Sequence, residues 1–445
     1  MAELKLCNCQ QTNPMNGARH IKIACFIFLF AWISFFPEPV QAQYWFYAKI
    51  FFGIFLLVLS LGKKFPRGFL SRQDLPLWLF LACVFSGTIS ALDKNLAFQT
   101  YLYILFTFAG LFYIGKNLCD SDQDRMAICI IICICGSLVA LIGSMELYYG
   151  RNILYEQFIS NPFYAKFIGP ALPAGIERYE RYTCRPMSTQ SEPSILAAYL
   201  LFCLPFSLYL FRSQSLRLRL LGIFSSLFYI LMIILSLSRI ALLGLVASLL
   251  VYLWYNKQRK RIIAVFFCLA ILMLAGTYFQ KSKLSRYGFS EMIYGKYDSL
   301  ISEHRFTRVA MTARIIKEHP FFGLGFNHFR IRFNEYCDKE EKGNVPYEYM
   351  VPDNMYLAFL AETGIVGTAG FLIFIIFLLR RILKAFNRMV DGASRRFLSA
   401  ASAALAGLLV HMAGYELFYW YNPYMLFCLT CGFIASVTQD KPLIK

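Results

Sequence analysis

Long apolar runs separated by short polar segments extend along almost the whole chain. A helix needs about 20 mostly apolar residues to cross the roughly 30 Å hydrocarbon core of a bilayer, and runs near this length predict about twelve transmembrane helices. They lie at residues 21–36, 44–61, 75–92, 96–115, 126–147, 192–211, 219–237, 239–255, 262–279, 365–383, 397–418 and 422–438. The pattern therefore predicts an all-α integral membrane protein with a single polytopic domain over residues 1–445.

The composition excludes a soluble globular fold. Hydrophobic residues make up 58% of the chain and charged residues 16%, whereas an average soluble domain is just under half apolar and about a quarter charged. The formal net charge is +18, which in a soluble protein would suggest a nucleic-acid partner. Membrane proteins instead concentrate Lys and Arg in their cytoplasmic loops. We therefore expect a lipid bilayer as the partner and no nucleic acid.

Charge alternates between successive loops. The short loops assigned to the outer side hold only Lys94 and Arg239, whereas basic residues cluster in the others. The largest inner cluster consists of Arg380, Arg381, Lys384, Arg388, Arg395 and Arg396. By the positive-inside rule both termini should face the cytoplasm. The first apolar run also fits a signal peptide that ends near Ala42, but its length and the spans that follow favour an uncleaved helix.

Two long segments remain on the outer side, at residues 148–191 and 280–364, and the chemistry should lie there. In the second segment the spacing of Val309 and Ile316 predicts a short amphipathic helix over residues 305–320. The glycine turn after it, at residues 321–326, either ends the helix or presents backbone N–H groups to an anion. Cys184 and Cys337 lie one in each segment, so a disulfide between them is an open alternative.

Three positions at the outer boundary are candidates for substrate binding. Arg185 and Glu192 precede the span that starts at Pro193, where they suit phosphate and sugar hydroxyls; a capped helix behind a basic loop is the alternative. Arg239 lies in the turn between two spans. It either snorkels to the surface or forks onto phosphate oxygens at the level of a lipid headgroup.

The end of the second outer segment carries further candidates. Asp353 or Asn354 should cap a short helix that ends near Gly364. The same position beside the membrane suits a general base, or a group that orients an acceptor hydroxyl. His304, His319 and His328 match no compact metal-ligand spacing, so we expect no metal site.

In order along the chain, these segments resemble the O-antigen ligase and O-antigen polymerase superfamily of bacterial envelope glycosyltransferases. The segments that carry the resemblance are Arg185 to Tyr199, the Ser238-Arg239 turn, Arg305 upstream of His319-Pro320-Phe321-Phe322-Gly323-Leu324-Gly325, Asp353-Asn354-Met355-Tyr356-Leu357, and Glu362-Thr363-Gly364-Ile365-Val366-Gly367. No single segment is specific, but the ordered set is.

The resemblance implies an inverting, metal-independent transferase without a cofactor, with a GT-C-like helical fold in the bacterial inner membrane and a periplasmic active site. The donor would be a glycan on undecaprenyl pyrophosphate, and the acceptor a second glycan or lipid A-core. Other polysaccharide-assembly proteins are further candidate partners. The implied catalytic residues are Arg239 and Arg305, on the pyrophosphate, and Asp353, which stands where ligases of the family carry a histidine.

We predict Arg185, Glu192, His319 and Asn354 as the substrate-binding residues. Because Asp353 replaces the ligase histidine, we favour a polymerase over a ligase or a protein O-oligosaccharyltransferase. A transporter or flippase of lipid-linked sugars is the alternative from another functional class. Transporters are often built from two related halves, but here the long segments follow the fifth and ninth predicted spans, so the chain shows no repeat of six plus six spans. A non-enzymatic assembly scaffold is a third possibility.

Overall fold

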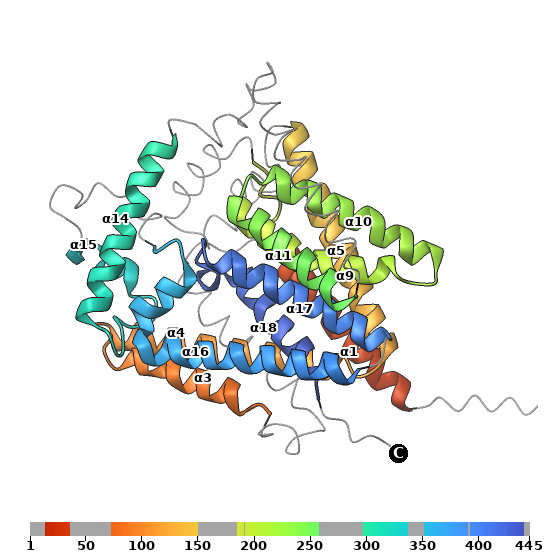
Figure 1. Ribbon diagram of the computed structural model, residues 1–445, viewed down its shortest axis with the longest axis horizontal. Coiled ribbons are helices and arrows are strands. Elements are labelled where there is room, and N and C mark those ends of the chain that lie inside the picture. Colours follow the sequence, from red (N-terminus) through yellow and green to blue (C-terminus); the bar gives the residue numbers. More distant parts are fainter. Residues whose placement is uncertain are drawn as a thin grey trace, which may run out of the picture.

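The computed structural model describes residues 14–35, 73–149, 185–190, 192–257, 297–336, 351–389 and 392–439. The helices in these ranges are α1 (Pro14–Phe35), α3 (Leu75–Phe85), α4 (Lys94–Leu118), α5 (Asp122–Tyr149), α9 (Pro193–Phe211), α10 (Leu216–Leu235), α11 (Arg239–Tyr255), α14 (Tyr297–Glu318), α15 (Phe329–Tyr336), α16 (Met355–Arg388), α17 (Ala393–Met412) and α18 (Tyr421–Val437). Two short 3-10 helices, η2 (Ser86–Thr88) and η6 (Leu417–Tyr419), complete the described elements. Within these ranges the protein is all-helical, as the sequence predicts (Figure 1).

Five of the described helices are long and apolar enough to cross a membrane: α4, α5, α9, α10 and α16. Helices α3, α11 and α18 and most of α1 are apolar but shorter. These helices confirm a multi-pass membrane protein. The predicted spans at 44–61 and 262–279 lie outside the described residues, so the total of twelve and the division into two outer loops stay predictions.

Helix α10 shows that the outside of the bundle suits lipid. Its large apolar side chains, such as Phe224 and Leu227, are exposed, whereas Gly222, Ser225 and Ser226 are buried against neighbouring helices. A helix on the surface of a soluble protein has the opposite arrangement, with its apolar stripe inward. Small and hydroxyl-bearing residues between helices are typical of packing within a bilayer.

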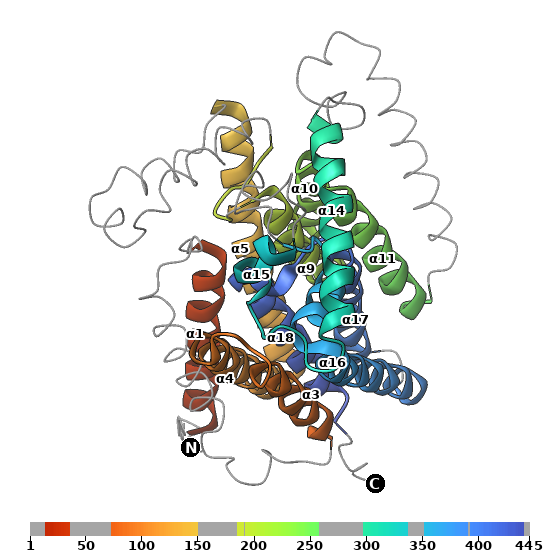
Figure 2. The same ribbon diagram turned by 90° about the vertical axis from the view of Figure 1, so that its left-hand side faces the viewer.

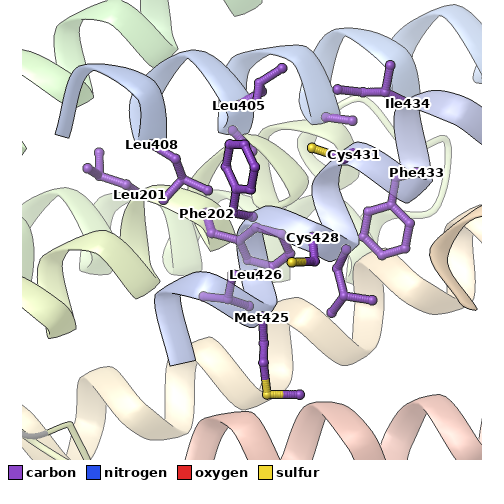
Figure 3. Packing of buried hydrophobic residues seen from close by; sticks show 14 of the residues in the cluster. Leu201, Phe202, Leu405, Leu408, Met425, Leu426, Cys428, Cys431, Phe433 and Ile434 are labelled. Carbon is purple, nitrogen blue, oxygen red and sulfur yellow. The ribbon is translucent and has the colours of Figure 1, made fainter. Parts of the chain in front are cut away.

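The centre of the bundle is formed by α9, α17 and α18. Every residue of α18 is buried, which is expected of a helix that is apolar on all sides. Figure 3 shows Phe202 of α9, Leu405 of α17 and Phe433 of α18 among the side chains of this core. These interior helices hold the polar turns at their ends in fixed positions.

Basic loops gather at one end of the bundle. Three hydrogen bonds join them there: Arg19 to Asp124 at 2.8 Å, Arg125 to Ser394 at 2.6 Å, and Arg396 to the carbonyl of Arg212 at 3.1 Å. These residues belong to the segments that the charge pattern assigns to one side of the membrane. The fold therefore brings together loops that the sequence groups only by their charge.

Helices α14 and α15 lie outside the bundle, near the start of α16 at the other end (Figures 1 and 2). The predicted helix exists, but α14 begins earlier than expected and is 22 residues long. Its buried face carries Met311 and Ile315, whereas Val309, which the sequence pattern placed on the apolar face, is exposed. It ends at Glu318, directly before His319-Pro320, as predicted, because proline cannot continue the ladder of backbone hydrogen bonds.

Candidate functional site

The turn after α14 is fastened to the first part of α16 by backbone hydrogen bonds. The N–H groups of Leu324 and Gly325 donate to the carbonyls of Ala361 and Glu362, each at 2.9 Å. The N–H of Gly323 also donates to a carbonyl, that of His319, at 3.1 Å. These three donors are used within the protein and are not available to an anion. The helix-ending alternative is the one that the structure supports.

Two glycines with positive φ make this contact possible. Gly323 has a φ of 68° and Gly364 a φ of 64°, a region that residues with a side chain rarely adopt. Gly364 interrupts the helical backbone within α16, and the N–H groups of Ile365 and Val366 then donate to the carbonyls of Pro320 and Phe321 at 2.8 and 3.2 Å. We call this contact between residues 319–325 and 361–366 the glycine clamp.

Asp353, immediately before α16, forms an ion pair with Arg308 of α14. The guanidinium and carboxylate lie 2.5 Å apart, and the side chains are 2% exposed for Arg308 and 25% for Asp353. The helix cap is Asn354, whose side-chain oxygen accepts from the N–H groups of Tyr356 and Leu357. Capping therefore accounts for Asn354 but not for Asp353, whose carboxylate is held by an arginine that the sequence did not single out.

The turn between α17 and α18, residues 413–420, lies against the same place. The Asn354 side chain donates to the carbonyl of Ala413 at 2.8 Å, and the Tyr415 hydroxyl donates to the Glu192 carboxylate at 2.6 Å. The next residue, Glu416, is 3% exposed and interacts electrostatically with both Asp353 and Glu192. We call Glu192, Asp353 and Glu416 the carboxylate cluster.

The cluster changes the ionisation of its most buried member. Burial raises the pKa of Glu416 to about 8, and the neighbouring charges of Asp353 and Glu192 act in the same direction. Removing a carboxylate from water disfavours its charged form, and so does a like charge nearby. Arg330 of α15 opposes this shift and lies 6.0 Å from the ring centroid of Tyr419.

Arg185 and Arg239 both lie at the backbone turn before α11. Arg185 donates to the carbonyl of Ser236 at 2.9 Å, and Arg239, exposed, is the first residue of α11. Ser194 bonds to Ser238 at 3.3 Å and so ties this turn to the start of α9, two residues after Glu192. The predicted site residues Arg185, Glu192 and Arg239 therefore come together.

Two other predicted residues are not placed in this group. His319 lies at the end of α14, where its Nε2 is 3.1 Å from the Tyr336 hydroxyl and 3.4 Å from Arg332. These contacts are with α15, so its substrate-binding role stays a prediction. Arg305 belongs to α14, but its side chain is outside the described residues.

Sequence reasoning missed Arg308, Arg330 and the role of Glu416. Arg308 is three residues from Arg305 on the same helix, which was the available signal, but a helix with several basic residues does not reveal which one turns inward. The described residues contain no group of three His, Cys, Asp or Glu that could hold a metal ion. Cys184 and Cys337 are outside the described residues, so the disulfide remains untested.

The fold and the site define a polytopic helical membrane protein with arginines and carboxylates gathered at one end of its bundle. Residues 224–372 match the family model described as O-antigen ligase, which supports the resemblance to the O-antigen ligase and polymerase superfamily. The match confirms the resemblance, and it indicates a glycosyltransferase-like activity of the ligase or polymerase type. No curated protein matches the chain. Arg239 and Asp353 fall within the matched range, whereas Glu192 and Glu416 lie outside it.

Proposed function

We propose that the protein transfers a glycan from a polyprenyl pyrophosphate to a glycan acceptor on the periplasmic face of the bacterial inner membrane. The observation that carries this proposal is the meeting of Arg185, Arg239 and the carboxylate cluster around two adjoining turns. Ile240, in the first turn of α11, lies against Gly414 of the turn between α17 and α18. Cations and carboxylates in this arrangement suit a pyrophosphate leaving group beside a hydroxyl nucleophile.

In this reaction the acceptor oxygen forms a bond to the anomeric carbon while the bond from that carbon to the pyrophosphate oxygen breaks. The electron pair leaves with the polyprenyl pyrophosphate. Guanidinium groups that are fixed near this oxygen stabilise the charge that develops there, and Arg239, with Arg185 beside it, has this role. Arg305 is proposed as a further pyrophosphate ligand.

Asp353 receives the hydrogen bond of the acceptor hydroxyl and takes its proton as the new bond forms. Attack on a sugar with oxocarbenium character makes this proton acidic late in the step, when the carboxylate can accept it. Arg308 fixes the direction of the carboxylate by the ion pair described above. Asn354 positions the loop through its cap and its bond to Ala413.

The sidedness of the molecule supports a periplasmic site. The basic loops meet at one end of the bundle, the end that the positive-inside rule assigns to the cytoplasm. The turns that carry Arg239 and Asp353 belong to segments that the same rule assigns to the opposite side. Both termini would then be cytoplasmic.

The test uses the purified protein in liposomes with an undecaprenyl-pyrophosphate-linked repeat unit, alone or with lipid A-core, and mass spectrometry of the products. Arg239→Ala should reduce product at least about 100-fold, the order expected for losing one donor to a transition-state oxyanion. Arg217→Ala is the matched control, because this exposed arginine lies in the first turn of α10 at the basic end. Equal activity of the two variants would remove Arg239 from the mechanism.

The products also distinguish a polymerase from a ligase. Longer lipid-linked chains identify a polymerase, which we favour because Asp353 replaces the ligase histidine, and a glycan-core conjugate identifies a ligase. A donor that stays intact while crossing the bilayer would refute the transferase proposal in favour of transport.

A further inference from the structure

The carboxyl group of Glu416 is buried without a full set of hydrogen-bond partners. It lies in the turn between α17 and α18 and is 3% exposed. Its Oε2 has no hydrogen-bond partner in the described part of the chain. A buried polar atom left unsatisfied costs about 1–3 kcal/mol, so native proteins keep few of them, often where a ligand or a reaction uses them.

Charged groups from three other segments face Glu416. Asp353 precedes α16, Glu192 precedes α9, and Arg330 lies in α15; each interacts with Glu416 electrostatically. Tyr419, in the same turn as Glu416, interacts with it as well. Three carboxyl groups that interact electrostatically cannot all be ionised at low cost. Asp353 is paired with Arg308, and Glu192 accepts a hydrogen bond from the Tyr415 hydroxyl. The proton therefore stays on Glu416, because burial raises the pKa of this carboxyl group to about 8.

A carboxylic acid that keeps its proton at neutral pH donates a hydrogen bond instead of accepting one. Next to it, the rings of Tyr415 and Trp420 are stacked with their centroids 6.2 Å apart and their planes 16° apart. Aromatic rings beside paired donors and acceptors are well suited to a sugar, which presents apolar C–H faces and a rim of hydroxyl groups.

We propose that neutral Glu416 donates a hydrogen bond to an oxygen of the acceptor sugar and so aligns the hydroxyl that Asp353 deprotonates. This inference rests on the transferase function proposed above and assigns it a residue outside the family-matched range. Glu416 neither gains nor loses its proton in the reaction; the proton of the acceptor hydroxyl goes to Asp353.

The experiment compares Glu416→Ala and Glu416→Gln over a range of pH, with the acceptor concentration varied. Alanine removes the donor and should raise the KM for the acceptor about tenfold, the effect of one lost hydrogen bond, with a smaller change in kcat. Glutamine keeps an N–H donor that cannot ionise. It should recover most of this loss, and its activity should persist at alkaline pH where the wild-type activity falls.

Glu318→Gln, which neutralises an exposed carboxylate at the end of α14, is the matched control and should leave the acceptor KM unchanged. A glutamine variant as impaired as the alanine variant would show that Glu416 acts as a carboxylate and would overturn the proposal. So would an unchanged KM for the acceptor in Glu416→Ala.

An infrared measurement separates this inference from the transferase proposal. The carbonyl-stretch band of a protonated carboxyl group should be present in the wild type at pH 7 and weaker in Glu416→Gln. Identical spectra would refute the neutral Glu416 even if glycan transfer is observed. If the band is found but the wild type leaves the lipid-linked donor intact, the proposed function fails while the protonation of Glu416 stands.

Discussion

Substitution of Gly364 by alanine should loosen the glycine clamp without removing α16 from the membrane. Gly364 combines a φ of 64° with a ψ of −166°, a conformation that is essentially restricted to glycine. A Cβ at this position would also overlap the backbone carbonyl of Phe321. The strain is relieved only if the turn after α14 moves away from α16.

The magnitude follows from what the clamp would lose. Backbone strain of this kind costs about 1–3 kcal/mol, and a hydrogen bond contributes about 1 kcal/mol. Loss of the bonds from Leu324 and Gly325 to the carbonyls of Ala361 and Glu362 brings the expected weakening to about 3 kcal/mol. Local opening should therefore become about 100-fold more frequent, since 1.4 kcal/mol corresponds to a factor of ten.

Amide hydrogen exchange read by mass spectrometry measures this opening directly. The peptide that contains Leu324 and Gly325 should exchange about 100-fold faster in Gly364→Ala, whereas peptides from the core helix α18 should not change. Gly414→Ala is the control, because the atoms nearest to its added Cβ belong to the side chain of Ile240, at 3.0 Å or more. Unchanged exchange at Leu324 in Gly364→Ala would refute the reasoning.

Two further predictions concern stability. Lys116 and Asp74 form a buried ion pair at 2.6 Å, so Lys116→Met should lower the free energy of unfolding by about 3 kcal/mol and lower the thermal midpoint in detergent. The double variant with Asp74→Asn should recover most of this stability. Additive losses from the two substitutions would contradict the prediction. Because the pKa of Glu416 is raised to about 8, the folded state binds more protons than the unfolded state between about pH 5 and pH 8, and stability should fall as pH rises through this range. This fall should be smaller in Glu416→Gln, and parallel pH curves of the two proteins would show that Glu416 does not titrate in this way.

The helices themselves were largely predictable from local pattern. The expected span at 239–255 coincides with α11, and Pro193 opens α9 as expected, because apolar length and helix-start signals are properties of neighbouring residues. The predicted end of the span at 397–418 is wrong, because α17 ends at Met412. Residues 413–420 are apolar enough to extend a span, but the fold uses them as a turn whose polar groups face Asp353 and Glu192.

The candidate site could be predicted only in part. Arg185, Glu192, Arg239 and Asp353 stand out because charged residues at the boundary of an apolar run are costly and therefore notable. Arg308 and Glu416 do not, because the orientation of a side chain around a helix or within a turn depends on what packs against it. The one-residue difference between a cap at Asn354 and an ion pair at Asp353 likewise depends on the approach of α14.

The sequence by itself determined that this is a helical membrane protein, which loops are basic, and which family its motifs resemble. These properties follow from hydrophobic length, loop charge and ordered motifs, all of which are local in the chain. Only the tertiary structure decided that Arg308 meets Asp353, that Tyr415 meets Glu192 across 223 positions, and that Glu416 is buried between them. Such contacts depend on how whole helices pack, and the free energy that selects one packing is shared among residues far apart in the sequence.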